Sequence, residues 1–130
     1  MDLYGKGYAD CVLAARIPLI EENPDAVKAV IKAMMTAQLA TEKNTLSTLE
    51  ETVGKYYKTS LESLKLAQSR QPVMIDQRNN TDFFYDRSVS MQKMGYVKNT
   101  LPSNALNWSL LEEVISENQD LYNSLELKAA

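Results

Sequence analysis

The chain has 130 residues, of which 45% are hydrophobic and 24% charged, a composition typical of one soluble folded domain. Its formal net charge is −3, with 14 basic against 17 acidic side chains, which argues against binding to nucleic acid because phosphates need a basic face. Histidine is absent, which excludes Ser-His-Asp and Cys-His catalysis, so we expect no enzyme, cofactor or metal site. No apolar run approaches the ~20 residues that cross a bilayer.

The first 22 residues are predicted to form an extended lead that contains one short strand. Residues 10–17 are a largely apolar run with β-branched side chains, typical of a buried strand or of one that needs a partner sheet. Pro18 is expected to end this strand. Because an unpaired strand edge invites pairing with another chain, we expect self-association through it.

A long helix is predicted to begin at Asn23-Pro24-Asp25. Asparagine favours the capping position, proline fits the first helical position, and an acidic residue is stabilised at the positive end of the helix. Apolar side chains then recur at helical spacing to about residues 41–43. The apolar stripe is broad, which predicts a helix that packs on more than one side.

Four further helices complete the prediction. Three open at capping-box matches S/T-x-x-E, and these begin at Ser47, Thr59 and Ser109. The first two predict helices over 48–58 and 60–70. The fourth begins at Thr81 or Asp82 and ends at Gly95, which takes a positive φ at low cost. The expected fold is one domain over 1–130, mainly α, with one short strand followed by about five helices over 23–130.

Three segments resemble one known family. Glu22–Ala29, with the sequence ENPDAVKA, resembles the segment that opens a long helix in substrate-binding proteins of ABC importers of the nitrate/sulfonate/taurine and thiamine-precursor type. Met91–Val97 is similar to that family's late helix ending at a glycine, and Asn107–Val114 resembles the start of its final helix. The matches occur in the family's order and spacing over about residues 8–120, so the chain resembles the C-terminal segment of such a protein.

The resemblance implies the remnant of an α/β type II periplasmic-binding-protein fold, as a truncated or excised portion. Family members are more than twice as long and hold a small polar or anionic solute in the cleft between two lobes, without transforming it, before passing it to an ABC permease. A periplasmic or extracytoplasmic location follows by resemblance. The chain has no signal-peptide pattern at its start, so the chain as given is expected to stay in the cytoplasm.

The ligand-binding residues expected in this segment lie at the cleft edge near the strand, and they are Tyr8, Asp10, Cys11 and Arg16. Three of them have a simpler interpretation. Tyr8 packs at a domain boundary, Arg16 is solvated or paired with Glu21 or Glu22, and Cys11 is a small buried apolar side chain with no histidine base to activate it. The alternative function is a stand-alone helical protein-interaction module, in which residues 1–17 are only a tail.

Overall fold

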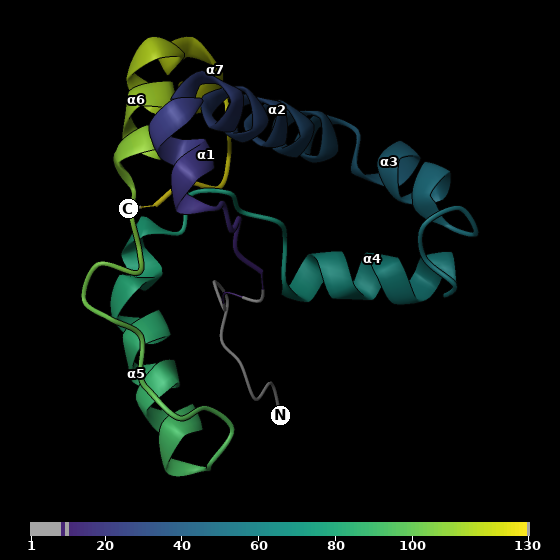
Figure 1. Cartoon of the computed structure of the whole chain (residues 1–130). Helices are drawn as coiled ribbons and strands as arrows, with labels where there is room; N and C mark the ends of the chain where they lie inside the picture. Colours follow the sequence, from purple (N-terminus) through teal and green to yellow (C-terminus); the bar gives the residue numbers. More distant parts are fainter. Residues whose placement is uncertain (1–8, 10, 130) are drawn as a thin grey trace.

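A computed structural model describes Ala9 and residues 11–129 of the chain, and this part is mainly helical (Figure 1). Seven α-helices and one 3-10 turn (η1) follow one another in it, without any β-strand. Their bounds are α1 Ile17–Glu22, α2 Pro24–Lys43, α3 Thr45–Thr52, α4 Leu61–Arg70, η1 Arg78–Asn80, α5 Thr81–Lys93, α6 Ser109–Glu117 and α7 Gln119–Asn123. The mainly α class is therefore confirmed for the described residues.

Helix α2 is the centre of the fold. Its buried apolar side chains recur every four residues, at Val27, Ile31 and Met35, so one face of the helix is apolar along most of its length. This face packs against α6 and α7. The other buried core residues are Leu111 and Val114 on α6, and Leu125, which follows α7. The predicted long helix is confirmed, with Pro24 in its first turn and its end at Lys43.

The predicted strand at 10–17 is not formed in the described residues. Residues 11–16 have no regular secondary structure, although Arg16 is extended at φ −70° and ψ 139°. A strand needs a second strand for its backbone hydrogen bonds, and the described part of the chain supplies none. Pro18 lies in the first turn of α1, where its missing N–H interrupts no bond. The prediction of an extended lead is thus wrong for residues 17–22.

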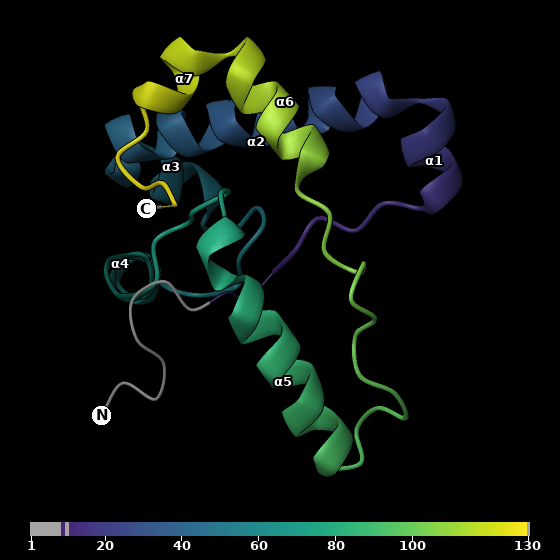
Figure 2. The same ribbon diagram turned by 90° about the vertical axis from the view of Figure 1, so that its left-hand side faces the viewer.

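Two parts project from the core (Figure 1). The first is the arm, residues 45–70, in which α4 packs against α3 and α3 against α2. The second is α5, alongside which the return loop, residues 94–108, runs back towards α6 (Figure 2). Side chains of α5 hold this loop: Tyr85 Oη donates to the Ser103 carbonyl at 2.8 Å, and Ser88 Oγ accepts from the Leu101 amide at 3.2 Å.

Helix α5 ends at Lys93, and Gly95 follows the capping residue Met94, as predicted. The φ of Gly95 is +78°, in the left-handed region that glycine tolerates best. The Tyr96 amide donates to the Met91 carbonyl at 2.9 Å and the Gly95 amide to the Gln92 carbonyl at 3.0 Å, which satisfies carbonyls that the helix end would otherwise leave unpaired. The chain therefore reverses directly into the return loop.

Candidate functional site

Of the four sequence-predicted ligand residues, Cys11 and Arg16 lie in the described part of the chain. Tyr8 and Asp10 lie outside the described residues, so their predicted role stays a prediction. Cys11 and Arg16 are both exposed, and the Arg16 carbonyl accepts the Leu19 and Ile20 amides at the start of α1. The interpretation of Cys11 as a buried apolar side chain is wrong, because no sheet covers the segment that carries it.

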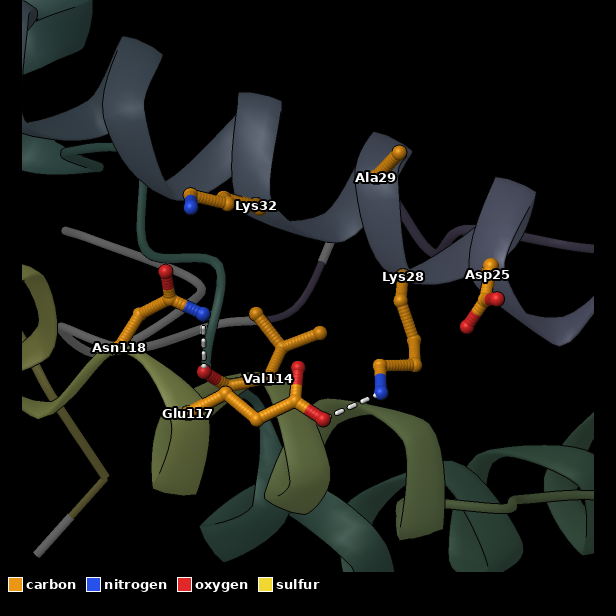
Figure 3. A pocket seen from close by; sticks show the side chains of 7 residues that line it. All are labelled: Asp25, Lys28, Ala29, Lys32, Val114, Glu117 and Asn118. Atoms are coloured by element: carbon orange, nitrogen blue, oxygen red, sulfur yellow. Dashed lines mark hydrogen bonds and ion pairs between the residues drawn. The ribbon is translucent and has the colours of Figure 1, made fainter.

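A shallow hollow lies where α2 faces α6, with a volume of about 490 Å³ (Figure 3). Most of its lining is polar or charged. The lining residues are Asp25, Lys28, Ala29, Lys32, Val114, Glu117 and Asn118. Figure 3 shows the Lys28 amine directed towards the Glu117 carboxylate, and the Asn118 amide donates to the Val114 carbonyl at 2.9 Å.

Lys28 forms two ion pairs across this hollow. Its amine bonds Glu117 and lies 3.4 Å from a Glu113 oxygen. The hydrogen bond to Glu117 is the main reason why the pKa of Lys28 is raised, so this amine stays protonated at neutral pH. A protonated amine is no nucleophile, and its bonds to both carboxylates occupy the acidic groups nearest to it. In the hollow, Lys28 of α2 is therefore linked to α6 by ion pairs with Glu113 and Glu117.

A buried carboxylate, Asp76, lies just before η1 and accepts four hydrogen bonds. Its side chain is only 3% exposed. Arg78 donates to it from its amide at 3.2 Å, from Nε at 3.0 Å and from Nη2 at 2.8 Å, and Tyr122 Oη donates at 2.6 Å. Burial alone would raise the pKa of Asp76, but the hydrogen bonds from Arg78 and Tyr122 outweigh it and lower the pKa. These three residues, here called the Asp76 node, tie the α4–α5 loop to α7.

A second buried polar group, Gln38 on α2, meets three parts of the chain. Its Oε1 accepts the Ile75 amide at 2.8 Å, and its Nε2 donates to Glu42 Oε1 at 2.7 Å and to the Leu127 carbonyl at 2.9 Å. Glu42 in turn accepts the Glu126 amide at 2.8 Å and the Leu127 amide at 3.2 Å. Every polar atom of the Gln38 amide is used, as burial of an amide requires.

Sequence reasoning missed both buried polar groups, although signals for them exist. Gln38 falls on the apolar stripe of α2, three residues after Met35, and a polar residue there predicts a buried hydrogen-bonding side chain. Asp76 follows Ile75 and stands two residues before Arg78, a spacing that permits a local ion pair. Their partners in residues 122–127 are distant in sequence, so no local pattern identifies them.

Most of the exposed large apolar side chains lie on three parts of the described structure, and Val30 and Val73 are exposed elsewhere. On the N-terminal segment and α1 they are Val12, Leu13, Ile17 and Leu19. On the arm they are Leu46, Tyr56, Tyr57 and Leu66. Near the end of α5 and in the return loop they are Val89, Met94, Tyr96, Val97 and Leu101. Scattered exposed apolar residues are ordinary, but contiguous groups mark surfaces that contact another structure.

Within residues 9 and 11–129, no three Cys, Asp or Glu side chains gather as metal ligands would. None of the described helices is long and apolar enough to cross a membrane. Comparison of the chain with protein-family models, with curated proteins and with solved structures finds no match. The function must therefore be argued from the residues and the geometry.

Proposed function

We propose that the chain is the C-terminal part of the solute-binding component of an ABC-type importer, which holds a small polar or anionic nutrient and does not transform it. The proposal starts from the resemblance of residues 22–29, 91–97 and 107–114 to that class of protein. In this role the chain supplies scaffold and one edge of the ligand cleft, at residues 8–16. The permease and the rest of the binding protein are its proposed partners.

The observation that carries the proposal is the exposure of the apolar segment before and within α1. Val12 is 58% exposed, Leu13 48% and Ile17 68%. Removing such side chains from water contributes about 1.5–3 kcal/mol each when burial is complete, so a chain that leaves adjacent ones uncovered is suited to a further structural layer. The sheet of the proposed binding protein would be that layer, and residues 11–16 would then pair as a strand.

The DNA around the coding sequence tests this proposal most directly. We expect the region upstream of Met1 to encode a βαβ-rich lobe, in frame or frameshifted, and neighbouring genes to encode a permease and an ATPase. In solution, the chain should bind a hydrophobic dye and self-associate in gel filtration, and small anions or pyrimidines should leave its melting temperature unchanged. A strictly monomeric, dye-silent chain in a genomic region without transport genes would overturn the proposal.

A stand-alone helical interaction module is the second candidate. The observation in its favour is that the core of α2, α6 and α7 closes without any strand among the described residues. The two proposals differ on residues 1–17. A module treats them as a tail, so their deletion should leave the melting temperature unchanged. Ala9 is buried and Ala15 packs against the core, so the binding-protein proposal expects a clear fall.

A further inference from the structure

We propose that residues 124–129, here called the clasp, set the position of the arm, and that Gln38 transmits this effect. The inference is independent of the transport proposal, because it follows from hydrogen bonds within the described chain. It concerns a conformational device: a C-terminal segment whose attachment to α2 controls how firmly the loop that follows α4 is held.

The arm has few attachments to the rest of the described fold. Among the helices, α4 packs only against α3, and α3 packs against the end of α2. A single residue, Asn44, separates α2 from α3, with φ −135° and ψ 48°. The other end of the arm leads into residues 71–77, here called the connector. The orientation of the arm therefore depends on the connector as well as on the Asn44 junction.

Two buried side chains hold the connector against the core. The Ile75 amide donates to Gln38 Oε1 at 2.8 Å, and Asp76 accepts from Tyr122 Oη at 2.6 Å. Gln38 and Asp76 are 2% and 3% exposed, so water does not readily replace these partners. The connector is thus fixed on one side to α2 and on the other to α7.

The clasp determines which way the Gln38 amide points. An amide has a donor end and an acceptor end, and its orientation follows from its partners. The donor end of Gln38 is held by the Leu127 carbonyl and by Glu42, and Glu42 is held by the Glu126 and Leu127 amides. Only with the donor end so placed does Oε1 face the Ile75 amide. Release of the clasp removes this constraint, so the hydrogen bond from the Ile75 amide to Gln38 weakens. The effect on Ile75 is indirect, because the clasp is bonded to Gln38 and Glu42 and not to Ile75.

The consequence is a link between the C-terminal segment and the surface of the arm. The arm carries Tyr56 and Tyr57, which are 68% and 54% exposed. A held connector presents these side chains in one orientation, and a released connector lets them take several. Any molecule that displaces the clasp from α2 would alter this presentation.

Amide hydrogen exchange of the full chain, resolved by NMR, tests the coupling with Glu42→Ala. This change removes the acceptor of the Glu126 and Leu127 amides and one of the two acceptors of Gln38 Nε2, while Ile75 and its own bond partner are left unchanged. We expect about tenfold faster exchange at Glu126 and Leu127 and also at Ile75, as the loss of one hydrogen bond of ordinary strength implies. The backbone amide of Ile31, in the core part of α2, should keep its protection from exchange. Glu126→Ala, which retains the backbone donor, is the matched control and should change none of these rates.

A second measurement follows the arm itself. Spin labels at Lys32→Cys on α2 and Lys65→Cys on α4, in a Cys11→Ser background, report the distance between core and arm. Glu42→Ala should broaden this distance distribution, whereas Glu126→Ala should not. Faster exchange confined to the clasp, or an unchanged distance distribution, would overturn the proposal. If Glu42→Ala also speeds exchange of the Ile31 amide, the core itself has loosened. Glu42→Gln, which retains one acceptor oxygen, is then measured in its place with the same criteria.

Discussion

Replacement of Asp76 by asparagine is the sharpest test of the energetics described above. The side chain keeps its size, but it loses its charge and gains an N–H donor that faces Arg78 or Tyr122. Removing one member of a fully buried ion pair costs about 3–5 kcal/mol. Here Asp76 is 3% exposed but the Arg78 side chain is 31% exposed, so the guanidinium keeps contact with water. Arg78 also lies 3.7 Å from a Glu112 oxygen, which remains as a partner.

These facts place the expected loss at about 2–3 kcal/mol, below the range for a fully buried pair. A domain of this size is stable by about 5–15 kcal/mol, so the loss is a substantial fraction of the total. Urea unfolding followed by circular dichroism measures it, with Asp86→Asn, an exposed carboxylate on α5, as the matched control. A change of less than about 0.5 kcal/mol for Asp76→Asn would refute the reasoning, because that is the range of an ordinary surface substitution.

The same variant isolates a pH dependence. The folded pKa of Asp76 is lowered, so its contribution to stability is complete above the unfolded pKa of ~3.9 and is lost as pH falls through the folded value. The difference in unfolding free energy between the wild type and Asp76→Asn should therefore shrink in acid. The difference must be used rather than the wild-type curve alone, because the pKa of Glu42 is lowered as well and its contribution fades in the same direction.

Three further changes test the fold. Met35→Ala, at a site 1% exposed, should lower the unfolding free energy by about 2–5 kcal/mol in urea, whereas Met94→Ala, at a site 59% exposed, should leave it nearly unchanged. Ser60→Ala should raise amide exchange in the first turn of α4 and lower stability by about 1 kcal/mol; an equal effect of Thr59→Ala would contradict the cap assignment. Gly95→Ala should lower the melting temperature through about 1 kcal/mol of left-handed strain, with no steric clash; an unchanged melting temperature would count against it.

The sequence predicts helices well where the signals are local and agree with one another. For α2, proline in the first turn, an acidic residue beside it and an apolar repeat every four residues all indicate the same helix, and the observed bounds match. The end of α5 at Gly95 is equally local, because one residue with positive φ is enough to stop a helix.

Helix starts were predicted less well, because the capping-box pattern matches by chance where short polar residues cluster. Ser47 lies inside α3, which begins at Thr45. For α4 the cap is Ser60 and not Thr59, since Ser60 Oγ accepts the Ser63 amide at 3.1 Å. At α6 the Ser109 amide donates to Asn107 Oδ1 at 2.9 Å, so Ser109 is capped rather than capping. At α4 and α6 the geometry of one hydrogen bond decides among neighbouring candidates.

The predicted strand was wrong and the two buried polar groups were missed for a different reason, because both depend on partners far away in the chain. Residues 10–17 have the composition of a strand, yet strand formation requires a second strand that no local pattern supplies. Helix α1 was missed at the same place, because Pro18 was interpreted as an end although proline suits the first turn of a helix. Asp76 meets Tyr122 across 46 residues, and Ile75 meets Gln38 across 37, so neither pair is visible in a local window.

The distribution of buried polar groups bears on what kind of protein this is. An apolar residue at position 38 would bury surface without needing partners, and replacing buried polar groups by apolar ones is often neutral for stability. The described fold instead places Gln38 and Asp76 at the points where the connector meets α2 and α7, and satisfies every hydrogen bond of each. Such bonds fix a geometry rather than add bulk stability, because they are strong only when all partners are in place. In the described part of the chain these directional bonds hold the connector in one geometry, while the arm and the N-terminal segment expose apolar side chains. The exchange of the Ile75 amide measures how firmly the connector is held.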